Sequence, residues 1–165
     1  MKTDQGFRAF FEREYPAVYR SALLLARDPQ SAEDATQEAF ARAFARWRRL
    51  APQPWAAGWV TTTAVNVARR QLRRRPTPPP RTTAELDGDA ALDVRAAVRA
   101  LPRRQQEAVV LFYLHDLPLA DVAAVMGLSE GTVKTHLARA RAALAEALAD
   151  VEEPPPTPVR RTSHG

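Results

Sequence analysis

Proline restricts the fold of this chain more than any other residue, because four prolines fall within five residues near its middle: Pro76, Pro78, Pro79 and Pro80. A proline ring fixes φ and removes the backbone N–H, so none of these residues suits a helix interior. We therefore expect a flexible linker over residues 76–89, between one small domain at residues 1–75 and another at residues 90–150. Residues 151–165 are too rich in proline and polar residues to fold, and we expect a disordered tail.

The rest of the sequence indicates an all-α fold. Alanine, leucine, arginine and glutamate are abundant, only 6 residues are glycine, and no sustained run alternates apolar and polar residues. The periodicity predicts four helices in each domain, over residues 3–14, 16–27, 32–49, 54–75, 90–100, 102–114, 118–126 and 130–149. Pro16, Pro54 and Pro102 would each open a helix, where a missing N–H costs nothing, and Ser31 is the expected N-cap of the third helix.

Positive charge is concentrated in two segments of a chain whose net charge is +5. Residues 39–84 contain ten arginines and no acidic residue, and residues 132–145 contain three basic residues and no acidic residue. Two basic segments separated by an acidic one indicate two contacts with polyanions such as nucleic acids. For a single arginine cluster, a solvated helix face is the alternative.

The composition also excludes several classes of protein. The chain has no cysteine, so it has no disulfide, thiol nucleophile or thiolate metal site, and its 3 histidines are too scattered for a metal motif. We find no secretory segment, no apolar run near the ~20 residues that span a bilayer, and no catalytic constellation. We therefore expect a soluble cytoplasmic protein without enzyme activity, cofactor, metal or small-molecule substrate.

Residues 117–144 have the layout of a helix-turn-helix, with a turn at Gly127 and an N-cap at Ser129. At about 100° per residue, one stripe of the second helix is apolar and should pack inward: Val133, Leu137, Ala140 and Leu144. The other side and one flank carry small, polar and basic residues that suit the ~12 Å major groove of DNA: Lys134, Thr135, Ala138, Arg139 and Arg141. Ser129 and Thr132 would contact phosphate at the helix N-terminus. A surface helix of an ordinary bundle is the alternative.

Two helices of the N-terminal domain are expected to carry polar faces. On the third helix, the face that holds Asp34, Gln37, Glu38 and Ala41 lies opposite an apolar stripe: Thr36, Ala39, Phe40, Ala43, Phe44 and Trp47. On the fourth helix, one side gathers an aromatic ring, hydroxyls, an amide and guanidinium groups: Trp59, Thr62, Thr63, Asn66, Arg69, Arg70 and Arg73. This chemistry suits single-stranded nucleic acid, because it combines backbone neutralisation with polar contacts to an unstacked base. Trp59 by itself fits a core position better than a stacking platform.

Three segments of the chain carry a family resemblance: AEDATQEAFARAFARW at residues 32–47, WVTTTAVNVARRQLRRR at residues 59–75 and LPRRQQEAVVLFYLHDLPLADVAAVMGLSEGTVKTHLARARAAL at residues 101–144. Together they resemble the extracytoplasmic-function (ECF) subfamily of bacterial RNA polymerase sigma factors. The resemblance covers nearly all of residues 7–148, in the same order and spacing. It implies an alternative sigma factor for transcription initiation, with a region 2-like domain at residues 1–75 and a region 4-like domain at residues 90–150.

The resemblance also implies partners. Asp34, Gln37 and Glu38, with Ala41 on the same face, match the stretch that docks on the clamp helices of the largest subunit of core RNA polymerase. The C-terminal domain would meet the polymerase flap, and the linker would run toward the RNA exit channel. An anti-sigma factor is a plausible further partner.

Promoter contacts follow from the same resemblance. Asn66 matches an asparagine that meets a flipped base of a melted minus-ten-type element, framed by the loop at residues 50–56. Its expected neighbours on the melted strand are Trp59, Thr63, Arg69, Arg70 and Arg73. The residues that match readers of a duplex minus-thirty-five-type element are Lys134, Thr135, Ala138 and Arg139.

Two other readings fit part of the sequence. A helix-turn-helix transcriptional regulator could act without being a polymerase subunit, and an RNA-binding adaptor could use the arginine run. The acid-free segment 39–84, together with the polar face around Asp34, favours a sigma factor over both.

Overall fold

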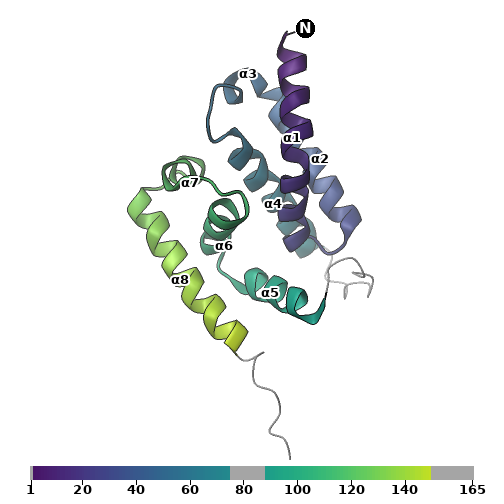
Figure 1. Ribbon diagram of the computed structural model, residues 1–165. Coiled ribbons are helices and arrows are strands. Elements are labelled where there is room, and N and C mark those ends of the chain that lie inside the picture. Colours follow the sequence, from purple (N-terminus) through teal and green to yellow (C-terminus); the bar gives the residue numbers. More distant parts are fainter. Residues whose placement is uncertain (1, 75–87, 150–165) are drawn as a thin grey trace, which may run out of the picture.

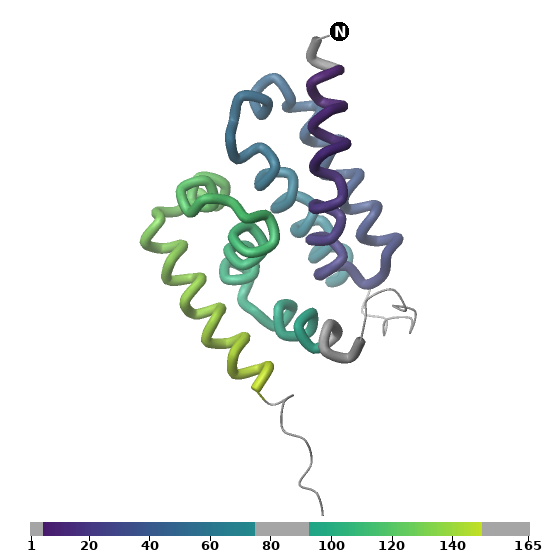
Figure 2. The backbone as a smooth tube through the Cα atoms, viewed as in Figure 1, coloured from purple at the N-terminus to yellow at the C-terminus, as the bar shows by residue number. Residues whose placement is uncertain are grey.

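The computed structural model describes residues 2–74 and 88–149, with side chains for residues 5–74 and 93–149. Every element in these residues is a helix, which confirms the all-α prediction (Figures 1 and 2). The predicted linker, apart from its last two residues, and the predicted tail lie outside the described residues. None of the described helices is both long enough and apolar enough to cross a membrane.

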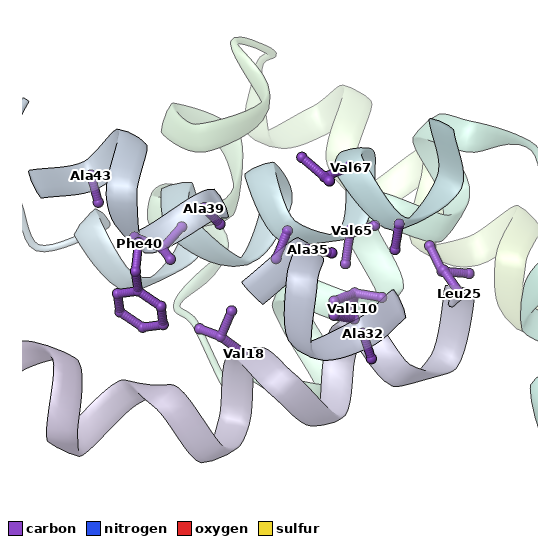
Figure 3. Close-up of a cluster of buried hydrophobic side chains, with 14 of the residues drawn as sticks. Val18, Leu25, Ala32, Ala35, Ala39, Phe40, Ala43, Val65, Val67 and Val110 are labelled. Carbon is purple, nitrogen blue, oxygen red and sulfur yellow. The ribbon is translucent and has the colours of Figure 1, made fainter. Parts of the chain in front are cut away.

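The first four helices form one group, which we call the N-terminal group: α1 (Lys2–Leu25), α2 (Pro29–Ala45), α3 (Trp47–Leu50) and α4 (Ala56–Arg74). Helices α1, α2 and α4 pack against one another in pairs. Small side chains at helical spacing on α2 are buried and permit this close approach: Ala32, Ala35, Ala39 and Ala43 (Figure 3). At the N-terminal end, aromatic side chains of α1 and α2 fill the core, and Trp59 packs against it half-buried.

Helix α1 continues through Pro16, so the predicted break into two helices is wrong. Pro16 is exposed, whereas Phe10 and Val18, before and after it, are buried in the same core. Burial on both sides of the proline therefore stabilises one continuous helix. It outweighs the cost of a proline in a helix interior, which is about 3 kcal/mol or more.

The predicted third helix also differs. Asp28, not Ser31, is the N-cap, because its carboxylate accepts a hydrogen bond from the Ser31 backbone N–H at 2.7 Å. This hydrogen bond is the main cause that lowers the pKa of Asp28. The helix then ends at Ala45, and a separate turn, α3, follows Arg46. Phe44 leaves the predicted apolar stripe: it is 52% exposed and touches Phe7 edge-on.

The remaining helices form the C-terminal group: α5 (Gly88–Ala100), α6 (Arg103–Val109), the π-helical turn η1 (Val110–Leu114), α7 (Leu119–Met126) and α8 (Glu130–Ala149). Its core joins α6, η1, α7 and α8 through buried residues such as Leu111, Val122 and Leu137. The predicted helix over residues 102–114 is present, but its second half is the wider π-helical turn.

The two groups pack against each other. Helix α1 contacts α5 and η1, and helix α4 contacts η1 and α7. Val110, at the start of η1, is 1% exposed and belongs to the core of the N-terminal group (Figure 3). The two cores therefore share a boundary built from apolar side chains.

Candidate nucleic-acid and protein interfaces

The turn between α7 and α8 depends on one glycine and one serine. Gly127 has φ +65°, the left-handed conformation in which a side chain would be strained. Ser129 Oγ accepts a hydrogen bond from the Thr132 backbone N–H at 3.1 Å and so caps α8. The helix-turn-helix predicted from the sequence is confirmed in these details.

Helix α8 presents an open face to solvent. Val133, Leu137 and Ala140 are buried, and Leu144 packs against the same core. The residues predicted to meet duplex DNA are all exposed: Ser129, Thr132, Lys134, Thr135, Ala138, Arg139 and Arg141. Arg141 donates a hydrogen bond to the Tyr113 hydroxyl at 3.0 Å, whereas Lys134 and Arg139 form no ion pair within residues 5–74 and 93–149.

Helix α4 carries the residues predicted to meet a melted strand, and their surroundings are less open. Trp59, Thr63 and Asn66 are half-buried, and the Arg46 guanidinium lies 5.8 Å from the centre of the Trp59 ring. Arg70 is exposed and pairs with Glu38 at 3.3 Å. Arg73 is exposed as well.

Arg69 was predicted to contact DNA, but in the structure its side chain is largely buried and bonded within the protein. Its side chain is only 13% exposed, and its guanidinium donates to Gln106 Oε1 of α6 and lies 3.8 Å from the Glu107 carboxylate. The same guanidinium donates to Asn66 Oδ1 at 2.6 Å. Burial lowers the pKa of Arg69 from its ordinary value, and the Glu107 charge opposes that shift. Arg69 is therefore engaged both by Asn66 and by α6.

The face predicted to bind a polymerase runs along the outside of α2. Asp34, Gln37 and Ala41 are exposed, and Glu38 is half-buried. Asp34 and Gln37 each form a hydrogen bond within α2: Gln30 donates to Asp34 at 3.0 Å, and Gln37 donates to Glu33 at 3.2 Å. Glu38 accepts from Arg42 on α2 and from Arg70 on α4, so one carboxylate joins the two helices.

A histidine between the groups carried no signal in the sequence. His115 Nε2 lies 3.0 Å from Ser21 Oγ on α1 and 2.9 Å from Thr61 Oγ1 on α4. Burial is the main cause that lowers the pKa of His115, and the Arg20 charge lowers it further. The Glu14 charge and a hydrogen bond with the Ala17 backbone act in the opposite direction.

Two arginines of α5 bind the C-terminal end of α1. Arg95 and Arg99 both donate to the carbonyl oxygens of Leu24 and Ala26, with Arg95 to Ala26 at 2.7 Å and Arg99 to Leu24 at 2.8 Å. Carbonyls at a helix C-terminus lack intrahelical partners, and cations complement the dipole there. Burial, together with the neighbouring Arg95, lowers the pKa of Arg99 to about 10. The i, i+4 spacing of the two arginines was the only sequence signal for this contact.

A cavity of about 210 Å³ lies where α4 meets α5 and α6, and four arginines are among its lining residues: Arg69, Arg73, Arg99 and Arg103. Three arginines pair with or approach the buried Glu107 carboxylate: Arg69, Arg103 and Arg104. Across the part of the chain with described side chains, no three acidic or histidine residues are grouped to hold a metal ion.

Comparison with known proteins divides the chain in two. Residues 10–76 match the family described as Sigma-70 region 2, and residues 91–144 match Sigma-70, region 4. The ECF RNA polymerase sigma factor SigM of Mycobacterium tuberculosis is 33% identical over 151 residues, which cover 87% of this chain and 77% of SigM. The RNA polymerase sigma-E factor of Streptomyces coelicolor is 30% identical over 152 residues, or 86% of this chain and 85% of that protein.

Solved structures show the same fold. The sigma factor RpoE of Bartonella quintana, in complex with the anti-sigma factor NepR, has a TM-score of 0.67 and 25% identity, and covers 89% of this chain and 98% of that one. CnrH, in complex with the cytosolic domain of CnrY, has a TM-score of 0.71 and 24% identity, and covers 92% and 96% of the two chains. The second likeness is one of fold alone.

Proposed function

The chain belongs to the ECF sigma factors, and we propose that it binds core RNA polymerase and directs it to a particular set of promoters. Residues 1–75 would bind the polymerase and hold a melted minus-ten-type element, and residues 90–150 would read a duplex minus-thirty-five-type element. The polymerase would supply the catalysis, and this chain would supply the choice of start site.

The open face of α8 is the observation that carries the proposal. Lys134 and Arg139 are exposed beside the small residues Thr135 and Ala138, on a helix fixed by the Ser129 cap. Small side chains permit a close approach to the major groove, where arginine or lysine can bind the O6 and N7 atoms of guanine. At the helix start, Ser129 and Thr132 would position the helix on phosphate.

The face of α4 supports the second part of the proposal. Asn66 would take up a base flipped out of the opened duplex, next to the loop at residues 50–56, with Trp59 and Thr63 beside it. Arg69, Arg70 and Arg73 would neutralise the strand. Because flipping a base costs a few kcal/mol, these contacts and the assembled holoenzyme must together offset that cost.

The face of α2 supports polymerase binding. The exposed Asp34 and Gln37 and the half-buried Glu38 would dock on the clamp helices, with Ala41 leaving room for the partner. RpoE of Bartonella quintana was solved with the anti-sigma factor NepR. By analogy, we also propose that an anti-sigma protein holds this chain inactive.

Reconstituted transcription tests the proposal. Core polymerase with this chain should initiate at discrete sites on genomic fragments, as start-site mapping would show, and core polymerase alone should not. Binding of the chain alone to a palindromic duplex site, with no effect on initiation, would instead indicate an ordinary helix-turn-helix regulator.

The docking face has its own test. Reversing both charges, Asp34→Lys with Glu38→Lys, should abolish co-purification with core polymerase. Glu12→Lys is the matched control, because Glu12 is an exposed acid on α1 that pairs only with Arg8 among the described residues. Normal co-purification of the double variant would remove α2 from the interface.

A further inference from the structure

The cavity of about 210 Å³ beside α4 is lined by two pairs of arginines, one from each helical group. Arg69 and Arg73 belong to α4, and their spacing of four residues places them on the same helix face. Arg99 belongs to the last turn of α5, and Arg103 is the first residue of α6. Guanidinium groups therefore approach the cavity from both groups.

The positive charge around this cavity is poorly neutralised. Within residues 5–74 and 93–149, Glu107 is the only carboxylate that pairs with a lining arginine, and Arg69 and Arg103 share it. Arg73 and Arg99 form no ion pair in the same residues. Burial lowers the pKa of Arg69, and the Arg103 and Arg73 charges act in the same direction, against that of Glu107. A bound anion would relieve this repulsion between like charges.

The lining arginines keep N–H donors for a ligand. A guanidinium carries five such donors. Arg99 donates from Nε and Nη2 to the carbonyls of α1, and Arg103 donates from Nε to Glu107. Arg73 is exposed, and 58% of the Arg103 side chain is exposed, so the cavity is open to solvent on their side.

The other lining residues favour an anion as well. Three leucines form apolar parts of the wall: Leu25, Leu72 and Leu101. The last lining residue, Gln106, is 3% exposed. Its amide oxygen already accepts from Arg69, and its amide nitrogen donates to the Val98 carbonyl. The lining side chains thus offer many donors and one acceptor that is already in use. The apolar wall lowers the local dielectric constant and strengthens attraction to an anion.

Size and symmetry indicate which anion fits. Guanidinium groups bind phosphate through two parallel N–H···O hydrogen bonds. A volume of about 210 Å³ is below the range of about 300–1,000 Å³ that is usual for sites of whole small molecules. Two arginine pairs match two adjacent phosphates. We propose that the cavity binds the diphosphate group of a small phosphorylated molecule, with one arginine pair on either side. This site goes beyond the proposed function and does not depend on it.

Calorimetric titration of the full chain with inorganic diphosphate, at constant ionic strength, would test the site. We expect one saturable site per chain, and orthophosphate, which can meet one pair alone, should bind about tenfold more weakly. Diphosphate should also raise the melting temperature, because a ligand of the folded chain stabilises it by mass action. Absence of saturable binding would overturn the proposal.

Charge-matched variants show whether the arginine pairs hold the anion. Arg73→Gln with Arg103→Gln should weaken diphosphate binding about tenfold or more. The fold should survive, because Glu107 keeps Arg104 at 3.1 Å. Arg8→Gln with Arg13→Gln is the matched control, since these arginines of α1 have side chains 81% and 67% exposed. Circular dichroism verifies that both variants remain helical. Equal losses in the two variants would reduce the effect to net charge and overturn the site.

The phosphates could instead belong to a nucleic-acid strand, because Arg69 and Arg73 are also proposed strand contacts. A 20-nucleotide, mixed-sequence, fluorescein-labelled single strand distinguishes the two sources. Arg103→Gln should weaken diphosphate binding and change strand affinity by less than about twofold. Loss of strand binding in this variant, with no diphosphate binding to the unmodified chain, would assign the phosphates to the strand and overturn the small-molecule site. The titration needs neither polymerase nor promoter, so its failure is distinct from failed co-purification with core polymerase.

Discussion

Helices α8 and α4 both carry basic residues expected to meet nucleic acid, but they differ in how free those residues are. On α8, Lys134 and Arg139 face solvent without an ion pair among the described side chains. On α4, Arg69 is 13% exposed and is held by α6. The comparison teaches that basic side chains can stand free on a capped helix, as on α8, whereas on α4 a residue proposed to meet a single strand is already held by the C-terminal group.

The largest expected effect is a loss of stability when the core beneath α8 is truncated. Leu137→Ala should lower the free energy of unfolding by about 2–5 kcal/mol, because Leu137 is only 3% exposed in the core beneath α8. Denaturant unfolding of the full chain would measure the loss. Leu114→Ala is the matched control, since Leu114 is 47% exposed. Equal losses in the two variants would contradict the packing of α8 on that core.

The next effect distinguishes α8 from α4 by their contributions to duplex binding. Arg139→Ala should weaken binding of the holoenzyme to a cognate upstream duplex by about 1–3 kcal/mol, provided that Arg139 contacts a base edge. Arg69→Ala should leave duplex binding unchanged. Competition binding with cognate and scrambled duplexes would measure both. An equal loss on the scrambled duplex would make Arg139 a phosphate contact rather than a base reader.

A smaller effect concerns Asn66 on α4, the proposed contact to a flipped base. Asn66→Ala should weaken open-complex formation by about 1 kcal/mol, the worth of a typical hydrogen bond, while polymerase binding stays intact. Permanganate reactivity of promoter thymines would measure the melted fraction. Unchanged reactivity would remove Asn66 from the melted-strand contact.

The smallest expected effect is a pH dependence of docking, by which we mean the packing of the C-terminal group on the N-terminal group. Burial holds the pKa of His115 below its ordinary value of 6.5, so the docked form prefers the neutral ring. Docking should be complete above pH 6.5 and should weaken as the pH falls through the lowered pKa, by at most about tenfold per pH unit for one proton. Glu14 and Arg20 act on the ring with opposite signs. Since the chain has no cysteine, dyes can be attached at Ala51→Cys and Ala124→Cys, one exposed site on each group. Energy transfer between the dyes from pH 8 to pH 5 would show the pH dependence, and His115→Gln should abolish it. A pH profile unchanged by that substitution would assign the effect to another group.

Local patterns predicted the C-terminal helix-turn-helix well. The turn at Gly127, the cap at Ser129 and the inward stripe of α8 are all present, because each depends on residues only a few positions apart. Boundaries in the N-terminal group were less predictable. Helix α1 runs through Pro16 because tertiary burial on both sides outweighs a local preference. The cap of α2 moved to Asp28, since an acid followed by proline competes well with Ser31 for the same role.

The sequence by itself determined the family, the all-helical fold, the polar faces of α2 and α4 and the capped, basic face of α8, because periodicity and motif spacing are properties of short segments. Tertiary structure alone decided that Gly58 lies against Leu117 and Val125 of the C-terminal group. It likewise decided that His115 contacts Ser21 and Thr61. It also decided that Arg69 turns toward α6. The physical reason is that these contacts join residues 37 to 94 positions apart, and the choice between solvent and such a partner is made only when the two groups pack.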